Sequence, residues 1–166
     1  MKRSMHAQEN HSGEMPQESD RLIREIYRAY TEEAAAIADY GYAALLLEAH
    51  LPAAAELFES IALTEMKHYE ALGRLLRDLN APFALRSMLH PFPYRLQGDA
   101  DSHAPVLTAQ IIKDRIRDEK TAHLTYRGLA KKALTERASA VLSALAEDEQ
   151  EHAAALQAFG ERLVRS

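Results

Sequence analysis

The sequence contains no cysteine and no tryptophan, and only six glycines and six prolines among 166 residues. The missing cysteine excludes disulfides, thiol nucleophiles, iron–sulfur clusters and rubredoxin-type iron from these residues. Histidine and carboxylate side chains are therefore the metal ligands that remain available. The scarcity of glycine and proline argues against a β-sandwich or barrel, because such folds need many tight turns.

Long apolar runs and a basic charge are also missing. The longest apolar runs, such as residues 42–47, fall far short of the ~18 residues of a membrane span. The N-terminal segment lacks the apolar stretch of a signal peptide. The formal net charge of −5 does not fit a nucleic-acid-binding surface. We therefore expect a cytoplasmic protein with no membrane or nucleic-acid partner.

Helix-forming residues dominate what is present, with alanine, leucine and glutamate the most frequent. The length fits one domain. We predict a polar, mobile tail over residues 1–19 and a bundle domain over residues 20–166. Helices are expected over residues 20–49, 52–79, 105–133 and 135–164. Asp20 and Thr135 are expected as N-caps, and Pro52 and Pro105 as residues of first turns.

The lengths of the connections predict the topology. Short links join the first two helices and the last two, so each pair should form an antiparallel hairpin. The proline-rich connection of roughly 25 residues between the pairs is long enough to cross the length of a bundle. This pattern predicts an all-α fold, a ferritin-like four-helix bundle of two antiparallel hairpins joined by one long crossover.

Each predicted helix has a seam of positions alternately three and four residues apart, the spacing of a stripe that faces a bundle core. The seams are apolar at both ends and ionisable in the middle. No lysine or arginine lies near the middle of a seam, and burying unpaired carboxylates is costly. Bound cations would balance them. The central positions are Glu33, then Glu65 and His68, then Glu119 and His123, then Glu149 and His152.

The two halves of the chain repeat this pattern. The Glu65-x-x-His68 segment recurs 84 residues later as Glu149-x-x-His152, and Glu33 and Tyr40 recur 86 residues later as Glu119 and Tyr126. Residues at i and i+3 project from one helical face, so such a Glu and His can approach one metal, or the Glu can bridge two. Four carboxylates and two imidazoles suit two Fe or Mn ions about 3.5–4 Å apart.

Four segments carry a resemblance to a known family. Residues 33–40, 61–68, 119–126 and 147–152 resemble the rubrerythrin-like branch of the ferritin-like superfamily, and the likeness extends over about residues 20–164. It implies a di-metal site with two Fe or Mn ions per chain. The implied roles are terminal carboxylates for Glu33 and Glu119, bridges for Glu65 and Glu149, and one imidazole per metal for His68 and His152. Tyr40 and Tyr126 resemble tyrosines that hydrogen-bond to ligands, although ordinary core packing would also explain them.

The sequence departs from rubrerythrins at two points. Ala122 stands where they carry an extra carboxylate, and these residues contain no rubredoxin module. The ligand set is therefore more symmetric, nearer to bacterioferritin or manganese catalase. A peroxidase of the rubrerythrin kind would need a separate electron donor.

Several further residues leave alternatives open. His123 is a third imidazole, a donor to a ligand or a hydrogen-bonded core residue. Asp148 is in register to orient His68, but its repeat partner is Thr64, a weaker acceptor. The remaining candidates are the tail residues His6 and His11, expected to be solvated, His50 and His90, which have no assigned role, and the apolar crossover residues Phe83, Met88, Phe92 and Tyr94, expected to cover the bundle or a partner subunit.

Three functions fit this pattern. The first is an oxidoreductase whose di-metal site reacts with hydrogen peroxide or dioxygen, as a peroxidase or a catalase. The second is an iron-handling ferroxidase of the ferritin kind. The third is a structural bundle held together by its metals. The apolar crossover residues and the family resemblance also predict an oligomer, a homodimer.

Overall fold

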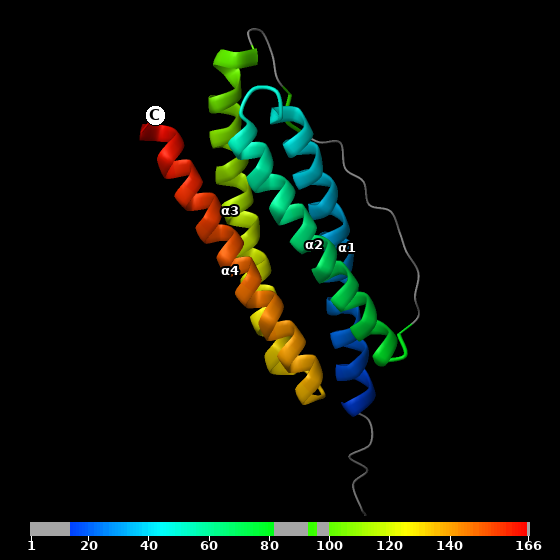
Figure 1. Ribbon diagram of the computed structural model, residues 1–166. Coiled ribbons are helices and arrows are strands. Elements are labelled where there is room, and N and C mark those ends of the chain that lie inside the picture. The colour runs from blue at the N-terminus through cyan, green and yellow to red at the C-terminus, as the bar shows by residue number, and fades with distance from the viewer. Residues whose placement is uncertain (1–13, 82–92, 96–99, 166) are drawn as a thin grey trace, which may run out of the picture.

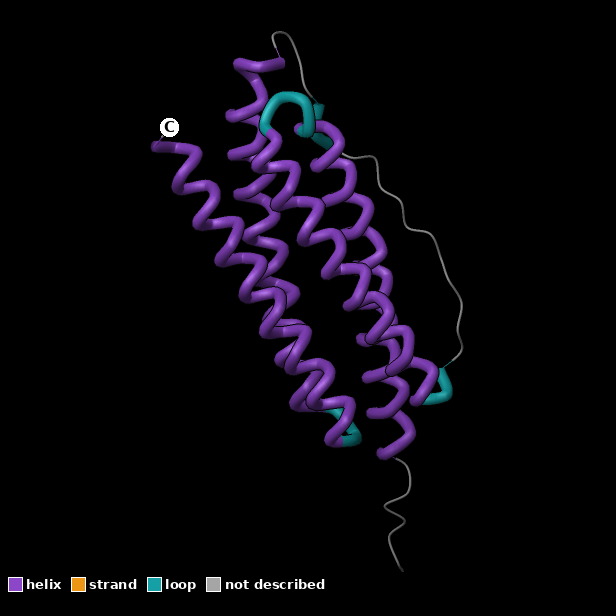
Figure 2. Tube along the Cα trace, in the orientation of Figure 1, coloured by secondary structure: helices purple, strands orange, loops and turns teal. Residues whose placement is uncertain are grey.

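The computed structural model describes residues 14–81, 93–95 and 100–165. Four helices make up the fold, and no strand occurs within those ranges. Helices α1 and α2 lie side by side, as do α3 and α4 (Figure 1), and the two pairs form one bundle (Figure 2). The predicted all-α bundle of two hairpins joined by a long crossover is confirmed. The helices are α1 (Glu14–Leu47), α2 (Pro52–Asp78), α3 (Ala100–Lys132) and α4 (Glu136–Arg165).

Local signals set the helix ends inside each hairpin. The backbone N–H of Ala138 donates to Thr135 Oγ1 at 3.1 Å, so Thr135 is the predicted N-cap of α4. Pro52 begins α2, where its missing N–H leaves no partner unsatisfied. At the other end of α2, Asn80 adopts the left-handed conformation with φ 53°, and the Ala81 N–H donates to the carbonyl of Leu76. This closure ends the helix.

Two predicted helix starts are wrong. Helix α1 begins at Glu14 rather than at Asp20, so residues 14–19, which we assigned to the tail, are helical. Pro16 falls in the first turn, where proline is tolerated. Helix α3 begins at Ala100 rather than near Pro105. Pro105 is the sixth residue of α3 and lies inside the helix, so its missing N–H removes one intrahelical hydrogen bond. His50 lies in the turn after α1, and its Nδ1 is 2.7 Å from Asp101 Oδ1. This contact connects the first turn of α3 to the first hairpin.

The core is layered along the bundle axis. One apolar cluster joins the first halves of α1 and α4 to the second halves of α2 and α3, and it includes Ile26, Leu72 and Leu142. A second joins the opposite ends of the helices, and it includes Phe58 and Ile111. We call these the first and second apolar clusters. The buried ionisable residues predicted from the seams lie between them: Glu33, Glu65, His68, Glu119, Glu149 and His152.

Part of the crossover contacts the bundle. Tyr94 packs against the second apolar cluster, and its hydroxyl donates to Asp114 Oδ2 at 2.5 Å. This agrees with the expectation that crossover residues cover the bundle. Phe83, Met88 and Phe92 lie outside the described residues, as do His6, His11 and His90. Within the described ranges, no helix has the length and apolar character of a membrane span.

Candidate metal centre

All four helices contribute carboxylates to the central layer, and α2 and α4 also contribute imidazoles. The six residues are at most 8% exposed, and they come from positions far apart in the sequence. The 3.6-residue period of the helices turns all six inward at one depth, because each lies on the same seam as the apolar residues above and below it. Their spatial arrangement divides them into two overlapping groups.

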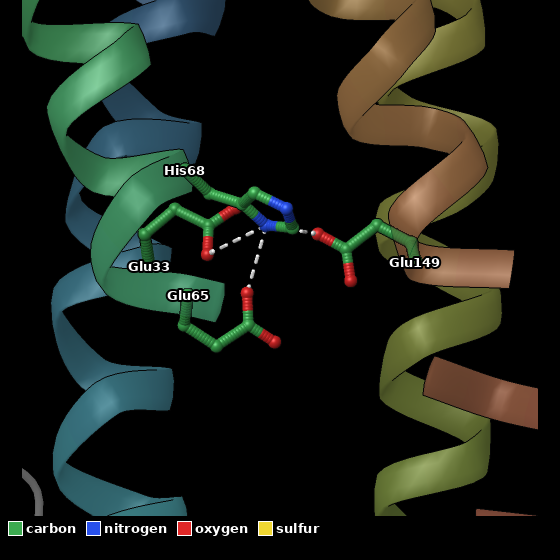
Figure 3. A group of neighbouring side chains, drawn as sticks. All are labelled: Glu33, Glu65, His68 and Glu149. Carbon is green, nitrogen blue, oxygen red and sulfur yellow. Dashed lines mark ion pairs between the residues drawn. The ribbon is translucent and has the colours of Figure 1, made fainter. Parts of the chain in front are cut away.

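The first group consists of Glu33, Glu65, His68 and Glu149, whose candidate ligand atoms lie within 4.8 Å of one another. His68 Nδ1 is 2.9 Å from Glu65 Oε2, 3.2 Å from Glu149 Oε1 and 3.9 Å from Glu33 Oε2. Figure 3 shows the imidazole of α2 directed toward the three carboxylates.

The second group consists of Glu65, Glu119, Glu149 and His152, again within 4.8 Å. His152 Nδ1 is 3.2 Å from Glu65 Oε1, 3.4 Å from Glu119 Oε2 and 3.5 Å from Glu149 Oε2. Glu65 and Glu149 thus occur in both groups, and each directs one oxygen to His68 and the other to His152. This is the arrangement that a carboxylate bridging two ions requires.

Unsatisfied polar atoms test whether these residues fit cations. Four buried atoms have no hydrogen-bond partner within the described residues: Glu65 Oε2, His68 Nδ1, Glu119 Oε2 and His152 Nδ1. Leaving such an atom unpaired costs about 1–3 kcal/mol. A cation in each group would bind all four. Oxygen and imidazole donors in this mixture suit iron or manganese, so the residues present fit two such ions.

The electrostatics show how the centre balances its charge without cations. Burial raises the pKa of Glu33 well above its usual 4.5, helped by repulsion from Glu65 and Glu149, and burial raises the pKa of Glu119 to about 8. Burial acts in the same direction on Glu149, but the facing imidazoles of His152 and His68 outweigh it and lower its pKa to about 2. The pKa of Glu65 is lowered for the same reason.

The two imidazoles respond in the opposite direction. Burial favours their neutral forms, but the neighbouring carboxylates outweigh it, and they raise the pKa of His68 to about 10 and that of His152 to about 12. Without cations, the raised pKa values of Glu33 and Glu119 favour neutral carboxyl groups, and those of His68 and His152 favour imidazolium ions. Binding divalent ions would therefore displace protons from the centre.

The two tyrosines cross between the hairpins. Tyr40 of α1 donates to Glu119 Oε1 of α3, and Tyr126 of α3 donates to Glu33 Oε1 of α1. Both are buried. Of the two interpretations that the sequence left open, the structure therefore shows hydrogen bonds to the carboxylates. The spacing of seven residues after a Glu did not indicate that each tyrosine bonds to the Glu of the opposite helix.

The structure also places the residues whose roles were open. Asp148 Oδ2 lies 3.2 Å from His68 Nε2, so it is positioned to orient that ring. His123 directs Nδ1 to the carbonyl of Ala146 at 2.7 Å and belongs to neither group. His123 is therefore a hydrogen-bonded core histidine rather than a third imidazole of the centre.

A cavity of about 350 Å³ between α1 and α3 reaches all four carboxylates. Arg115 lines it, pairs with Asp39 at 3.1 Å and Asp118 at 3.3 Å, and lies over the Tyr40 ring at 5.9 Å. Ala122 is among the small residues that line the cavity, so the departure from rubrerythrins noted above lies at this opening. Arg115 was not predicted from the sequence. Its position one helical turn before Glu119 was the available signal.

Fold and site together define a class of protein: a four-helix bundle of two hairpins, with buried carboxylates and imidazoles able to bind metal at its centre. The sequence model of the ferritin-like domain family matches residues 23–166, and the chain belongs to this family. A similar solved structure is that of the bacterioferritin-related protein from Bacteroides fragilis, described as a dodecameric thioferritin. It aligns with a TM-score of 0.70 and 18% identity over 89% of this chain and 88% of that chain. No curated protein is significantly similar.

Proposed function

We propose that this chain binds two iron or manganese ions and reduces hydrogen peroxide or dioxygen with them. The observation that carries the proposal is the orientation of Glu65 and Glu149, each of which presents one oxygen to each group of ligands. Glu33 and His68 would complete one half of the centre, and Glu119 and His152 the other. Two such ions, when bound, would supply the two electrons that convert one hydrogen peroxide and two protons to two waters.

The residues of the chain prepare the centre for this chemistry. The four carboxylates balance the charge of two divalent ions, and the apolar clusters exclude water from either side. Tyr40 and Tyr126 fix the orientation of the two terminal carboxylates. The cavity between α1 and α3 gives a small oxidant access to the four carboxylates. In a peroxidase cycle, an external donor would supply the electrons, because each turnover consumes two of them.

Elemental analysis tests whether the chain binds two ions. Protein produced with ample iron and manganese is expected to hold about two ions per chain, since the two half-sites each provide one imidazole and share two carboxylates. Glu65→Ala should lose both ions, Glu33→Ala should retain partial occupancy, and Glu32→Ala, on the exposed face of α1, should retain both. A metal content near zero in wild-type protein never exposed to chelator would reject the proposal.

An iron-handling ferroxidase is the second candidate. It is favoured by the structural similarity to a protein described as bacterioferritin-related and dodecameric. Supplying excess ferrous ion and oxygen separates the two. A ferroxidase retains oxidised iron far beyond two ions per chain. A peroxidase consumes peroxide in proportion to added reductant, and a catalase consumes it without reductant. A bundle with purely structural metals does neither.

We further propose that the working unit is a cytoplasmic homodimer. Large apolar side chains are exposed on the described surface, including Leu45 at 74% and Leu124 at 68%. Such side chains are common at subunit interfaces. Sedimentation at micromolar concentration should give at least twice the chain mass of 18.6 kDa. A monomer would contradict the dimer without affecting the metal centre.

A further inference from the structure

The outer side of α3 carries a row of exposed cations. Its positions alternate four and three residues apart, the spacing that keeps side chains on one helical face. Each position comes one residue after a position of the buried seam, so the row runs beside the seam along the helix. The row consists of Lys113, Arg117, Lys120, Leu124, Arg127 and Lys131, all of them exposed. These cations form an unbalanced local charge in a chain whose formal net charge is −5.

Few acidic side chains neutralise this row. Arg117 pairs with Asp114 at 3.5 Å and with Asp118 at 3.3 Å, and its side chain remains 70% exposed. Within the described ranges, the other four cations form no ion pair: Lys113, Lys120, Arg127 and Lys131. Their charge is therefore available to a partner molecule.

A groove between α3 and α4 extends the row toward α4. Its volume is about 420 Å³, and Arg127 and Lys131 line its α3 side. The α4 side contributes Ser139 and Ser143, and the acidic residue in the lining is Glu147. We call the row and this groove together the basic face.

The internal repeat gives the basic face a counterpart in the first hairpin. With the shift of 86 residues described above, the row corresponds to Tyr27, Thr31, Ala34, Ala38, Gly41 and Leu45 of α1. With the shift of 84 residues, Leu63 and Met66 of α2 stand where α4 has Glu147 and Gln150, and they are 56% and 46% exposed. None of these α1 and α2 positions is charged. The two hairpins therefore present an apolar face and a basic face on opposite sides of the bundle (Figure 1).

The two faces fit different partners. The apolar face fits a second copy of the chain, because a two-fold dimer packs the same uncharged surface of both copies together. Leu45, one of the exposed side chains that support the dimer, lies on it. The basic face lies on the other side and would stay accessible in such a dimer. Two copies of the basic face would repel each other, so its partner carries the opposite charge.

We propose that the basic face is the docking surface for a small acidic electron-transfer protein, the external donor of the peroxidase cycle. The inference rests on the proposed function in its peroxidase form. Two one-electron donors are oxidised for each hydrogen peroxide that takes up two protons and yields two waters. The exposed cations surround one exposed leucine, Leu124 at 68%. In transient complexes, charge steers the encounter and a small apolar contact holds it.

The position of the basic face favours electron transfer. Lys120 directly follows Glu119, and Leu124 directly follows His123, so the middle of the row lies at the depth of the metal centre. The helix α3 separates the two, and an α-helix is about 10–12 Å across with its side chains. A donor bound to this face is therefore separated from the centre by little more than one helix.

Two acidic donors of different chemistry serve as probes: reduced plant-type [2Fe–2S] ferredoxin and reduced flavodoxin. Binding of each to the metal-loaded full chain is measured without peroxide at several ionic strengths, and oxidation of each is followed after peroxide is added. Hydroquinone, a small uncharged reductant that needs no docking surface, gives the basal rate. At least one probe should bind with an affinity that falls steeply as the salt concentration rises.

Matched substitutions separate the basic face from the net charge. The face variant removes three cations of the row: Lys120→Gln, Arg127→Gln and Lys131→Gln. The control variant removes three exposed cations from α1, α2 and α4: Arg24→Gln, Arg74→Gln and Arg165→Gln. At low salt, the face variant should slow association of the probe by about 10–100-fold, and the control variant by no more than about threefold. Turnover with hydroquinone should be unchanged in both variants.

A substitution of the leucine tests the apolar contact separately. Leu124→Ser should leave the association rate within a factor of about two and speed dissociation of the probe several-fold, because it changes the contact and not the charge. An unchanged dissociation rate would remove Leu124 from the docking surface.

The outcomes separate this inference from the proposed function. Absence of binding by both probes, or equal slowing in the face and control variants, would overturn the docking surface and leave the metal centre intact. Tighter binding of a short DNA duplex that displaces both probes would also overturn it, since the face would then bind nucleic acid. No peroxide turnover with any donor, hydroquinone included, would reject the peroxidase function, and the donor assignment would fall with it.

Discussion

The apolar ends of the bundle and its ionisable centre are built on the same four helices but have opposite energetic effects. At the ends, residues such as Phe58 and Leu142 are fully buried against apolar neighbours, so their burial favours folding. At the centre, four carboxylates and two imidazoles lie in the same core, and four of their polar atoms lack hydrogen-bond partners. The centre therefore costs stability when cations are absent.

This contrast indicates that folding and metal binding are separable. The ends supply enough apolar contact on both sides of the centre to form the bundle. The centre can therefore keep its unpaired polar groups without unfolding the protein. Protons act as the substitute partners when cations are absent, since the raised pKa values of the two imidazoles and of two carboxyl groups favour their protonated forms. Changes at the ends should alter stability, and changes at the centre should alter metal binding and its pH dependence.

The largest expected effect on stability comes from the ends. Leu142→Ala removes a fully buried side chain from the first apolar cluster and should lower the free energy of unfolding by about 3–5 kcal/mol. Denaturant titration of metal-free protein measures the change. Lys113→Ala, at an exposed position of α3, is the control and should change stability by less than about 0.5 kcal/mol. Under conditions where Leu142→Ala is folded, its metal content should match the wild type. A parallel loss of metal would show that ends and centre are coupled.

The next effect is an unusual pH dependence of the metal-free protein. Glu33 and Glu119 have raised pKa values, so the stability from their protonated forms is lost as pH rises from 4.5 through about 8, the pKa of Glu119. His68 and His152 also have raised pKa values, and the stability from their charged forms is lost as pH rises from 6.5 through about 10 and 12. All four groups make the folded state bind more protons than the unfolded state, so stability falls with rising pH.

Glu149 contributes in the opposite direction. Its pKa is lowered to about 2, so its stabilising charge is present above pH 4.5 and is lost as pH falls through 2. Metal-free protein should therefore be most stable near pH 5 and clearly less stable at pH 9. The metal-loaded protein should show the reverse trend between pH 5 and 8, because binding needs deprotonated ligands. Thermal unfolding of both forms across this range provides the measurement. A metal-free protein more stable at pH 9 than at pH 5 would contradict the charge balance.

A smaller effect is expected from neutralising one carboxyl group. Glu119→Gln keeps the shape of the side chain and the oxygen that accepts from Tyr40, but it cannot ionise. At pH 9 the metal-free variant should be more stable than wild type by about 1–3 kcal/mol, because it avoids an uncompensated buried charge. At pH 5 the two should agree, since Glu119 is then protonated. Glu161→Gln, on the exposed end of α4, should show no difference at either pH.

The sequence predicted the seams and the layering because both depend on a strict helical period. The same period brought Glu65 and His68 to one face, and the capping role of Thr135 followed from its position before a periodic segment. The starts of α1 and α3 were misplaced, because the acidic and proline residues near them are compatible with either a loop or a first turn. The contact between His50 and Asp101 supports the start of α3. The two residues are 51 positions apart, so no local sequence pattern indicates this contact.

Side-chain partners on different helices could not be predicted from the sequence either. Tyr40 shares a seam with Glu33, yet it bonds to Glu119, because the tyrosine lies two turns away along α1 and faces α3 there. Arg115 lies just off a seam, and its role depends on Asp39 of another helix. Periodicity tells which face of a helix is buried, but the partner across the core depends on the packing of the two hairpins.

The smallest predicted effect concerns the hydrogen bond that Tyr126 donates to Glu33. Tyr126→Phe preserves the ring in the first apolar cluster and removes only the hydroxyl. A hydrogen bond to a buried carboxyl group contributes about 1 kcal/mol, and here that bond also orients Glu33, whose other oxygen lies 3.9 Å from His68 Nδ1. Metal-free stability should fall by about 1 kcal/mol, and the affinity of the half-site containing Glu33 should fall several-fold, with two ions still bound at saturation. Tyr40→Phe provides the matched comparison, since it should weaken the half-site containing Glu119 instead. Metal titrations that weaken the same half-site in both variants would show that the crossed pairing does not control the ligands.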